Sequence, residues 1–177
     1  MTELERAAEA WIEPYWNAEH LRRARDWLLV LDPAAGEAAR IAALTHDIER
    51  HFPGGPSNSL DDPPDEPTYR RLHSERSAGF VTGWLREQGA GEALVAEVEA
   101  LVLLHENGGT PEADLVQAAD SLSFLEINAT LVEGWVREGR CTAERGAAQL
   151  QWMYDRMQVA RADELGRPLL EAAIARL

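Results

Sequence analysis

The sequence has one cysteine, Cys141, among its 177 residues, and this excludes an intramolecular disulfide. It has no apolar run near the roughly 18 residues that a membrane-spanning helix needs, so we expect no membrane partner. Its first residues are acidic and lack an apolar core, which does not predict a signal peptide. A reducing, cytoplasmic location is the expectation that follows.

Positive charge is also scarce. The chain carries 17 Lys and Arg against 31 Asp and Glu, which gives a formal net charge of −14. Long-range electrostatics would therefore repel nucleic acid or an anionic membrane, and we expect neither as a partner. A local group of Arg side chains could still bind one phosphate, because a guanidinium matches phosphate oxygens in bidentate geometry.

Alternation of apolar and polar residues with a period of two is absent, and apolar residues follow a helical period almost everywhere. The sequence therefore predicts an all-α fold: a single domain over residues 1–177, built as a bundle of seven or eight helices. Pro and Gly, together with capping residues such as Asp32 and Thr110, set the expected boundaries. The expected helices are about 2–13, 17–31, 33–51, 68–88, 92–106, 111–138, 142–165 and a short terminal one.

One stretch, residues 52–67, is not compatible with a helix. It contains five prolines and two glycines, which forbid a continuous helix or strand. We expect a long surface loop, which is either a lid over a site or simply a mobile connection.

Several His and Asp residues fall on helix faces that should otherwise be apolar. His20 is one turn from Trp16, and the pair His46-Asp47 follows an apolar run. His105 and Asp120 also lie on apolar stripes. A carboxylate in such a position is costly unless it is paired or bound to a metal.

Each of these residues also has a simpler explanation. A lone His on an apolar face is usually a hydrogen-bonded core residue, and Asp120 could cap a helix or pair with an Arg. We expect His51, beside the loop, to be solvated. Glu49 and Glu106 are expected to be exposed, with support of a ligand His as the alternative. The five Trp residues at helical positions are expected to pack in the core, with Trp16 a possible wall of the pocket.

Taken in chain order, the candidates resemble the HD-domain superfamily of metal-dependent phosphohydrolases. That family has a His, a His-Asp pair on another helix and a distant Asp, and members with two metals add two His in between. The matching positions are His20 in EHLRRA, His46-Asp47 in LTHDIER, His73 in LHSERSA, His105 in LLHEN and Asp120 in AADSL. After the pair, Glu49 and Arg50 stand where many members have Gly and Lys.

The resemblance implies an HD-type bundle with a motif-bearing core over about residues 17–128, and C-terminal helices over about 142–177 that pack on it. It implies that the metal ligands are His20, His46, Asp47, His73, His105 and Asp120. Imidazole and carboxylate ligands suit Mn, Fe, Co, Ni or Zn, whereas Ca prefers oxygen ligands alone. We expect one or two ions per chain, with Asp47 able to bridge two of them.

The expected function is hydrolysis of a small phosphorylated molecule, a nucleotide, phosphomonoester or small phosphodiester, through a metal-bound hydroxide. Arg50 and Arg76 each lie one turn after a ligand, so we expect them to contact this anionic substrate and, with Asp47, to be catalytic. The alternative readings are a mixed-valent di-iron oxygenase of the same superfamily and a non-catalytic helical binding module. A homodimer is possible.

Overall fold

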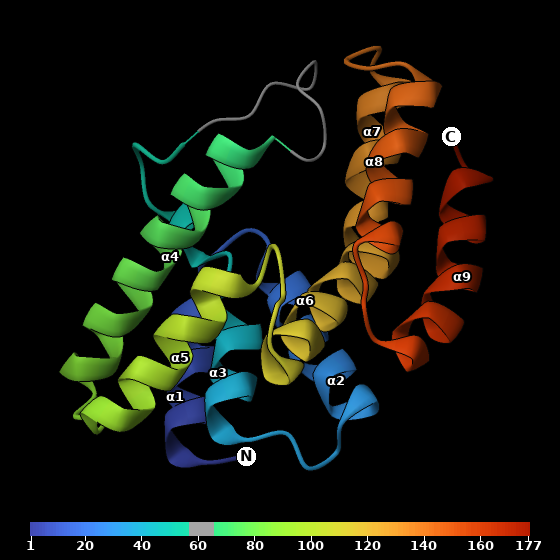
Figure 1. Ribbon diagram of the computed structural model, residues 1–177. Coiled ribbons are helices and arrows are strands. Elements are labelled where there is room, and N and C mark those ends of the chain that lie inside the picture. Colours follow the sequence, from blue (N-terminus) through green and yellow to red (C-terminus); the bar gives the residue numbers. More distant parts are fainter. Residues whose placement is uncertain (57–65) are drawn as a thin grey trace.

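The computed structural model describes residues 1–56 and 66–177 (Figure 1). These residues contain no strand, which confirms the predicted all-α fold. The α-helices are α1 (Glu3–Ile12), α2 (Ala18–Leu31), α3 (Glu37–Thr45), α4 (Pro67–Glu87), α5 (Glu92–Leu104), α6 (Pro111–Ser123), α7 (Ala129–Arg137), α8 (Ala143–Asp155) and α9 (Ala160–Ile174). A 3₁₀ helix, η1 (Ile48–His51), and a π-helix, η2 (Phe124–Asn128), complete them.

The helices form two groups joined by α2 and α6. Helices α1, α3, α4 and α5 lie together on one side, and α7, α8 and α9 lie on the other (Figure 1). The larger apolar core is built mainly from α1 to α6, and a smaller one is built from η2, α7, α8 and α9. Burial of these two cores supplies the main force that holds the helices in place. The C-terminal helices thus pack beside the motif-bearing part.

Several helix starts agree with the sequence because the capping residues act as expected. Thr110 accepts a hydrogen bond from the backbone N–H of Ala113, and Thr142 accepts one from Arg145, each over 3.2 Å. Thr2 forms a capping box with Glu5 at the start of α1. Each of these contacts satisfies a backbone donor that the first helical turn leaves unpaired.

The predicted start of the third helix at Asp32 is wrong. Asp32 instead follows the end of α2, and its side chain accepts a hydrogen bond from the N–H of Ala34 over 2.9 Å. This local turn uses the carboxylate that would otherwise cap a helix. Helix α3 begins at Glu37 and stops at Thr45, so that His46 and Asp47 lie at its end rather than in its middle.

The predicted helices over 111–138 and 142–165 also differ in detail. The first is continuous but contains the π-helix η2; if α6, η2 and α7 are taken as one, the described residues form eight α-helices, as predicted. The predicted helix over 142–165 is wrong. Helix α8 ends at Asp155, the chain turns, and a separate helix, α9, begins at Ala160 and contains Pro168. Gly166 lies where α9 passes close to α6: a Cβ there would come within 3.3 Å of Leu122.

The proposed lid over 52–67 lies largely outside the described residues. Among the residues that the structure describes, none of the helices is both long and apolar enough to span a membrane.

Candidate metal centre

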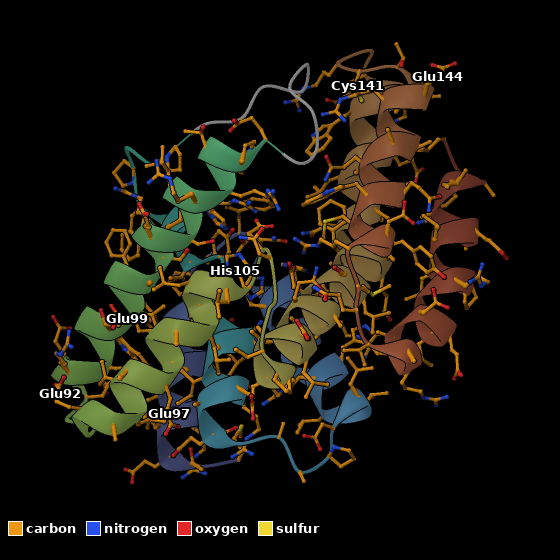
Figure 2. All side chains as sticks on the ribbon, viewed as in Figure 1. Glu92, Glu97, Glu99, His105, Cys141 and Glu144 are labelled. Atoms are coloured by element: carbon orange, nitrogen blue, oxygen red, sulfur yellow. The ribbon has the colours of Figure 1, made fainter. Side chains whose placement is uncertain are left out.

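All six candidate ligands are buried, although they come from five different parts of the helical bundle. The first turn of α2 carries one, the end of α3 carries two, and α4, the end of α5 and α6 carry one each; in that order they are His20, His46, Asp47, His73, His105 and Asp120. In Figure 2, His105 lies at the centre of the molecule, where these helices meet. The bundle thus brings together every residue of the predicted ligand set.

One group of ligands is formed by α2, α3 and α6. The Nε2 atoms of His20 and His46 lie 3.1 and 3.3 Å from the same atom, Oδ1 of Asp120. Potential ligand atoms of His20, His46 and Asp47 also lie within 4.8 Å of one another. Two imidazoles and two carboxylates therefore surround one small volume.

A second group shares Asp47 with the first. Oδ1 of Asp47 lies 2.7 Å from Nε2 of His73, and ligand atoms of Asp47, His73 and His105 lie within 4.8 Å of one another. The ring centroids of His46 and His105 are 5.0 Å apart, and those of His73 and His105 are 5.3 Å apart. Asp47 has two oxygens and lies between the two groups, so it could bridge two ions.

Hydrogen bonds at Nδ1 turn the lone pairs of His46 and His105 toward the centre. Nδ1 of His46 lies 3.0 Å from the carbonyl oxygen of Ala43, and Nδ1 of His105 lies 2.7 Å from that of Val102. A carbonyl oxygen only accepts, so each Nδ1 must carry the proton and each Nε2 is left as a potential metal ligand. Both contacts arise because each His directly follows the last residue of its helix, within reach of a carbonyl three residues back.

His20 and His73 are oriented by side chains. Oγ of Ser123 donates to the backbone carbonyl of His20 over 2.7 Å, so it must accept from Nδ1 of the same residue, 2.8 Å away. Nδ1 of His73 donates to Oε1 of Glu49 over 2.9 Å. Partners of this kind fix the ring and raise the basicity of a metal-binding nitrogen.

The Nε2 atoms of His46, His73 and His105 are buried and have no hydrogen-bond partner. The 2.7 Å contact from His73 to Asp47 is close, but its atoms are not aligned as in a hydrogen bond. Buried polar atoms without a partner are rare and costly. A set of lone pairs aimed at a common volume fits a bound transition metal, and it disfavours the reading of these residues as ordinary core histidines.

The outer oxygens of the two carboxylates are held by arginines. Nη1 of Arg50 donates to Oδ2 of Asp47 over 2.5 Å, and Nη2 of Arg156 donates to Oδ2 of Asp120. Burial alone would raise the pKa of Asp47 and of Asp120, but Arg50 and Arg156, with the adjacent imidazoles, outweigh it. Each pKa lies well below its usual value, so both groups are ionised and ready to bind a cation at neutral pH.

The imidazoles differ in the direction in which their pKa values are shifted. Burial lowers the pKa of His105 to about 4, which leaves it neutral at pH 7. Burial acts in the same direction on His46 and His73, but the carboxylates of Asp120 and Asp47 outweigh it and raise the pKa of each. A cation at these two rings would therefore compete with protons more strongly than a cation at His105.

The two arginines expected to contact substrate lie in different places. Arg50 lines the cavity beside Asp47 and donates to the hydroxyl of Tyr69 over 3.0 Å. Nε of Arg76 lies 3.1 Å from Oε2 of Glu49, and its Nη2 donates to the carbonyl of Pro53. Arg76 is not among the described residues that line the cavity. This geometry gives Arg76 a contact with Glu49, behind His73, and its expected contact with substrate stays a prediction.

The expectation that Glu49 and Glu106 are exposed is wrong: they are 1% and 8% exposed. Glu49 matches the alternative, since it supports His73 through the hydrogen bond described above. Oε1 of Glu106 lies 3.7 Å from Nε2 of His105, and its Oε2 accepts from Arg156 over 2.5 Å. His51 is exposed, as expected.

Arg156 contacts the candidate centre and was not predicted from the sequence. It ends α8 and ties together Asp120, Glu106 and Ser121, the last at 2.9 Å from its Nε. It is separated from the ligand set by more than thirty residues of chain, and only the fold brings it there. No local pattern in the sequence marks it, because its carboxylate partners lie 36 and 50 residues earlier in the chain.

The candidate centre lies at the floor of a cavity of about 350 Å³. His20, Asp47 and Asp120 contribute to its floor, and α4, η2, α7 and α8 supply its walls. Trp16 is 64% exposed and lines the cavity, so its expected place in the core is wrong and it matches the alternative, a wall of the pocket. Trp27 and Trp84 are buried, as expected.

Comparisons with known proteins add no relative. A scan against models of protein families finds no match, and searches of curated proteins and of solved structures find no significant match. The resemblance to HD-domain proteins thus depends on the order of the ligand residues alone.

Proposed function

We propose that this protein is a metal-dependent phosphohydrolase that acts on a small phosphorylated molecule. The observation that carries the proposal is the pair of buried ligand groups that share Asp47 at the floor of a cavity. Three unpartnered Nε2 atoms point into this volume together with two ionised carboxylates. This donor set fits Mn, Fe, Co, Ni or Zn, with room for two ions.

Divalent ions held by these residues would lower the pKa of a water molecule and neutralise charge on phosphate oxygens. The chain itself supplies the positioning. His20, His46 and Asp120 would hold one ion, His73 and His105 the other, and Asp47 both. In the reaction, the water oxygen bonds to phosphorus, the bond from phosphorus to the ester oxygen breaks, and that oxygen takes up a proton.

Cationic side chains around the floor suit an anionic substrate. Arg50 lines the cavity with its side chain about one third exposed, while one of its nitrogens holds Asp47. Its positive charge would attract phosphate oxygens and stabilise the charge that builds on them as the bond breaks. Glu106 also lines the cavity. Burial would raise the pKa of Glu106, but Arg156 and His105 outweigh burial and lower it, so the carboxylate is ionised. Its carboxylate can accept a hydrogen bond from the attacking water and orient it.

The test is phosphate release from a panel of phosphate esters, with Mn, Fe, Co and Ni supplied in turn. We expect turnover by the native protein and a fall of about 100-fold or more in kcat/KM for Arg50→Ala. Arg71→Ala is the matched control, because Arg71 lies on the exposed side of α4 and pairs with Glu75 at 3.0 Å. Phosphate release that is absent with every metal, in protein shown to contain metal, would overturn the proposal. Oxygen uptake by the iron form would then favour the oxygenase.

A further inference from the structure

The side-chain amide of Asn17 lines the cavity beside the first ligand of the candidate centre. Asn17 directly precedes α2 and lies three residues before His20, so the two side chains are neighbours at the first turn of this helix. Asn17 is 5% exposed, and its Nδ2 has no hydrogen-bond acceptor among the described residues. A buried amide nitrogen without an acceptor is costly, so its place in this wall needs an explanation.

Capping of α2 does not explain Asn17. Asn is one of the residues that best cap a helix, because its side-chain oxygen can accept from a backbone N–H of the first turn. Asn17 instead has backbone angles of φ −106° and ψ 23°, outside the extended region that a capping residue usually adopts, and its side chain makes no cap. The amide is therefore left for another partner.

A second buried donor without a partner lies close to this amide. Tyr15 is 2% exposed, and within the part of the chain that the structure describes its hydroxyl has no hydrogen-bond partner. Burial raises the pKa of this hydroxyl and Asp47 adds to the rise, whereas Arg50 and Asn17 act in the opposite direction. The Tyr15 hydroxyl is thus protonated, and it lies near both Asn17 and the floor of the cavity.

One rotation of the Asn17 amide would satisfy both groups. A turn of 180° about its Cβ–Cγ bond places Oδ1 where Nδ2 was, and this oxygen can accept the proton of the Tyr15 hydroxyl. The NH₂ group then faces away from Tyr15 and offers its donors to the cavity. A carboxamide has nearly the same shape in both orientations, so the rotation requires no shift of the backbone.

A neutral donor at this position suits a phosphate oxygen. Arg50 lines the same cavity, but its Nη1 donates to Asp47 and its Nη2 donates to Tyr69, so it cannot by itself satisfy every oxygen of a phosphate. The NH₂ group of Asn17 donates and does not accept, so it would bind an oxygen atom rather than a cation. It also brings no charge that would compete with the carboxylates for a metal ion.

We infer that Asn17 is a substrate-binding residue, whose Nδ2 donates to a non-bridging oxygen of the reacting phosphate while the Tyr15 hydroxyl holds its Oδ1. The phosphate would be contacted from two sides, by Arg50 of η1 and by Asn17 before α2. This inference rests on the proposed function and adds to it one phosphate-binding residue and one positioning residue, Tyr15. Hydrogen bonds to a charged group are stronger than those between neutral groups, and this sets the size of the expected effects.

The test uses inorganic phosphate as the probe, with its Kd for the Mn-loaded protein measured by calorimetry. Asn17→Leu keeps a similar side-chain volume but removes both donors, and it should weaken phosphate binding by about tenfold or more. The variant should keep its Mn content, and it should not lower the urea midpoint of the ligand-free protein, because it removes a buried amide that has no partner. Gln151→Leu is the matched control: it removes an exposed amide of α8 that donates to Asp155 over 2.7 Å, and the Kd should not change.

Tyr15→Phe tests the positioning role. Loss of the hydroxyl should weaken phosphate binding by about threefold in the native background. It should add nothing in the Asn17→Leu background, because the two side chains act as a unit. Equal effects of Tyr15→Phe in both backgrounds would remove Tyr15 from the account.

Three results would overturn the role of Asn17. They are an unchanged Kd in Asn17→Leu, the absence of phosphate binding by the Mn-loaded native protein, and weaker binding that is accompanied by loss of Mn or by a lower urea midpoint. The last result would give Asn17 a structural role only. Phosphate release from esters tests the proposed function separately: a protein that binds phosphate through Asn17 but hydrolyses no ester would contradict the proposed function and leave this binding role in place.

Discussion

His73 donates through Nδ1 to Oε1 of Glu49 over 2.9 Å, while its Nε2 faces Oδ1 of Asp47 at 2.7 Å. Glu49 thus sets the orientation of one ligand of the second group without lining the cavity itself. The carboxylate is in turn paired with Arg76. A chain of three side chains therefore fixes one nitrogen of the candidate centre.

Glu49→Ala should weaken the binding of one metal ion by about 10–100-fold, because His73 loses the partner that fixes its ring and tautomer. Titration with Mn of protein stripped by a chelator would show one weakened site and one unchanged. Glu75→Ala, at an exposed position on α4, should leave both sites unaltered. Two sites that stay equally tight in Glu49→Ala would contradict this role.

Ser123→Ala tests the other group. Without the Ser123 hydroxyl, Nδ1 of His20 has no acceptor, and the site formed with His46 and Asp120 should lose about tenfold or more in affinity. The same Mn titration should now show the opposite site weakened. If Ser123→Ala and Glu49→Ala affect the same ion, the division of the ligands into two groups is incorrect.

Arg156→Gln should destabilise the metal-free protein by about 3–5 kcal/mol, because the buried carboxylates of Asp120 and Glu106 lose their counterion. Urea unfolding in the presence of EDTA measures this loss. Added Mn should recover part of it, since a cation beside Asp120 replaces the missing charge. Arg167→Gln, which breaks an exposed pair, should change the free energy of unfolding by less than about 0.5 kcal/mol.

The low pKa of His105 predicts a pH dependence of stability in metal-free protein. Between its folded pKa of about 4 and its usual value of 6.5, the unfolded chain binds a proton that the folded chain does not. The free energy of unfolding should therefore fall as pH is lowered from 6.5 to 4, by about 3 kcal/mol from this residue. His46 and His73, whose pKa values are raised, bind a proton more tightly in the folded than in the unfolded chain, so near pH 6.5 they act in the opposite direction to His105. Denaturation at pH 6.5 and 4.5 should show a smaller decrease for His105→Gln, and an equal decrease would contradict the assignment.

The sequence predicts the ligand set well because each member is a polar residue on a helix face that must be buried. His20, His105 and Asp120 interrupt apolar stripes, and a helical period is sufficient to show it. The helix boundaries near His46 are harder, because a side chain that satisfies its own turn, as Asp32 does, looks like a helix cap in the sequence. Arg156 could not be predicted in this way: its partners lie 36 and 50 residues earlier in the chain. Such a contact depends on how α8 packs against α6, which a local pattern does not contain.

The most direct test of the account is the metal content of the purified protein, measured by elemental analysis after incubation with Mn or Fe and removal of free ions. We expect about two transition-metal ions per chain in the native protein and in His51→Ala, and a loss of both in Asp47→Asn, since Asp47 belongs to both ligand groups. A native protein that binds no transition metal, or an Asp47→Asn variant that keeps the full complement, would contradict the central claim.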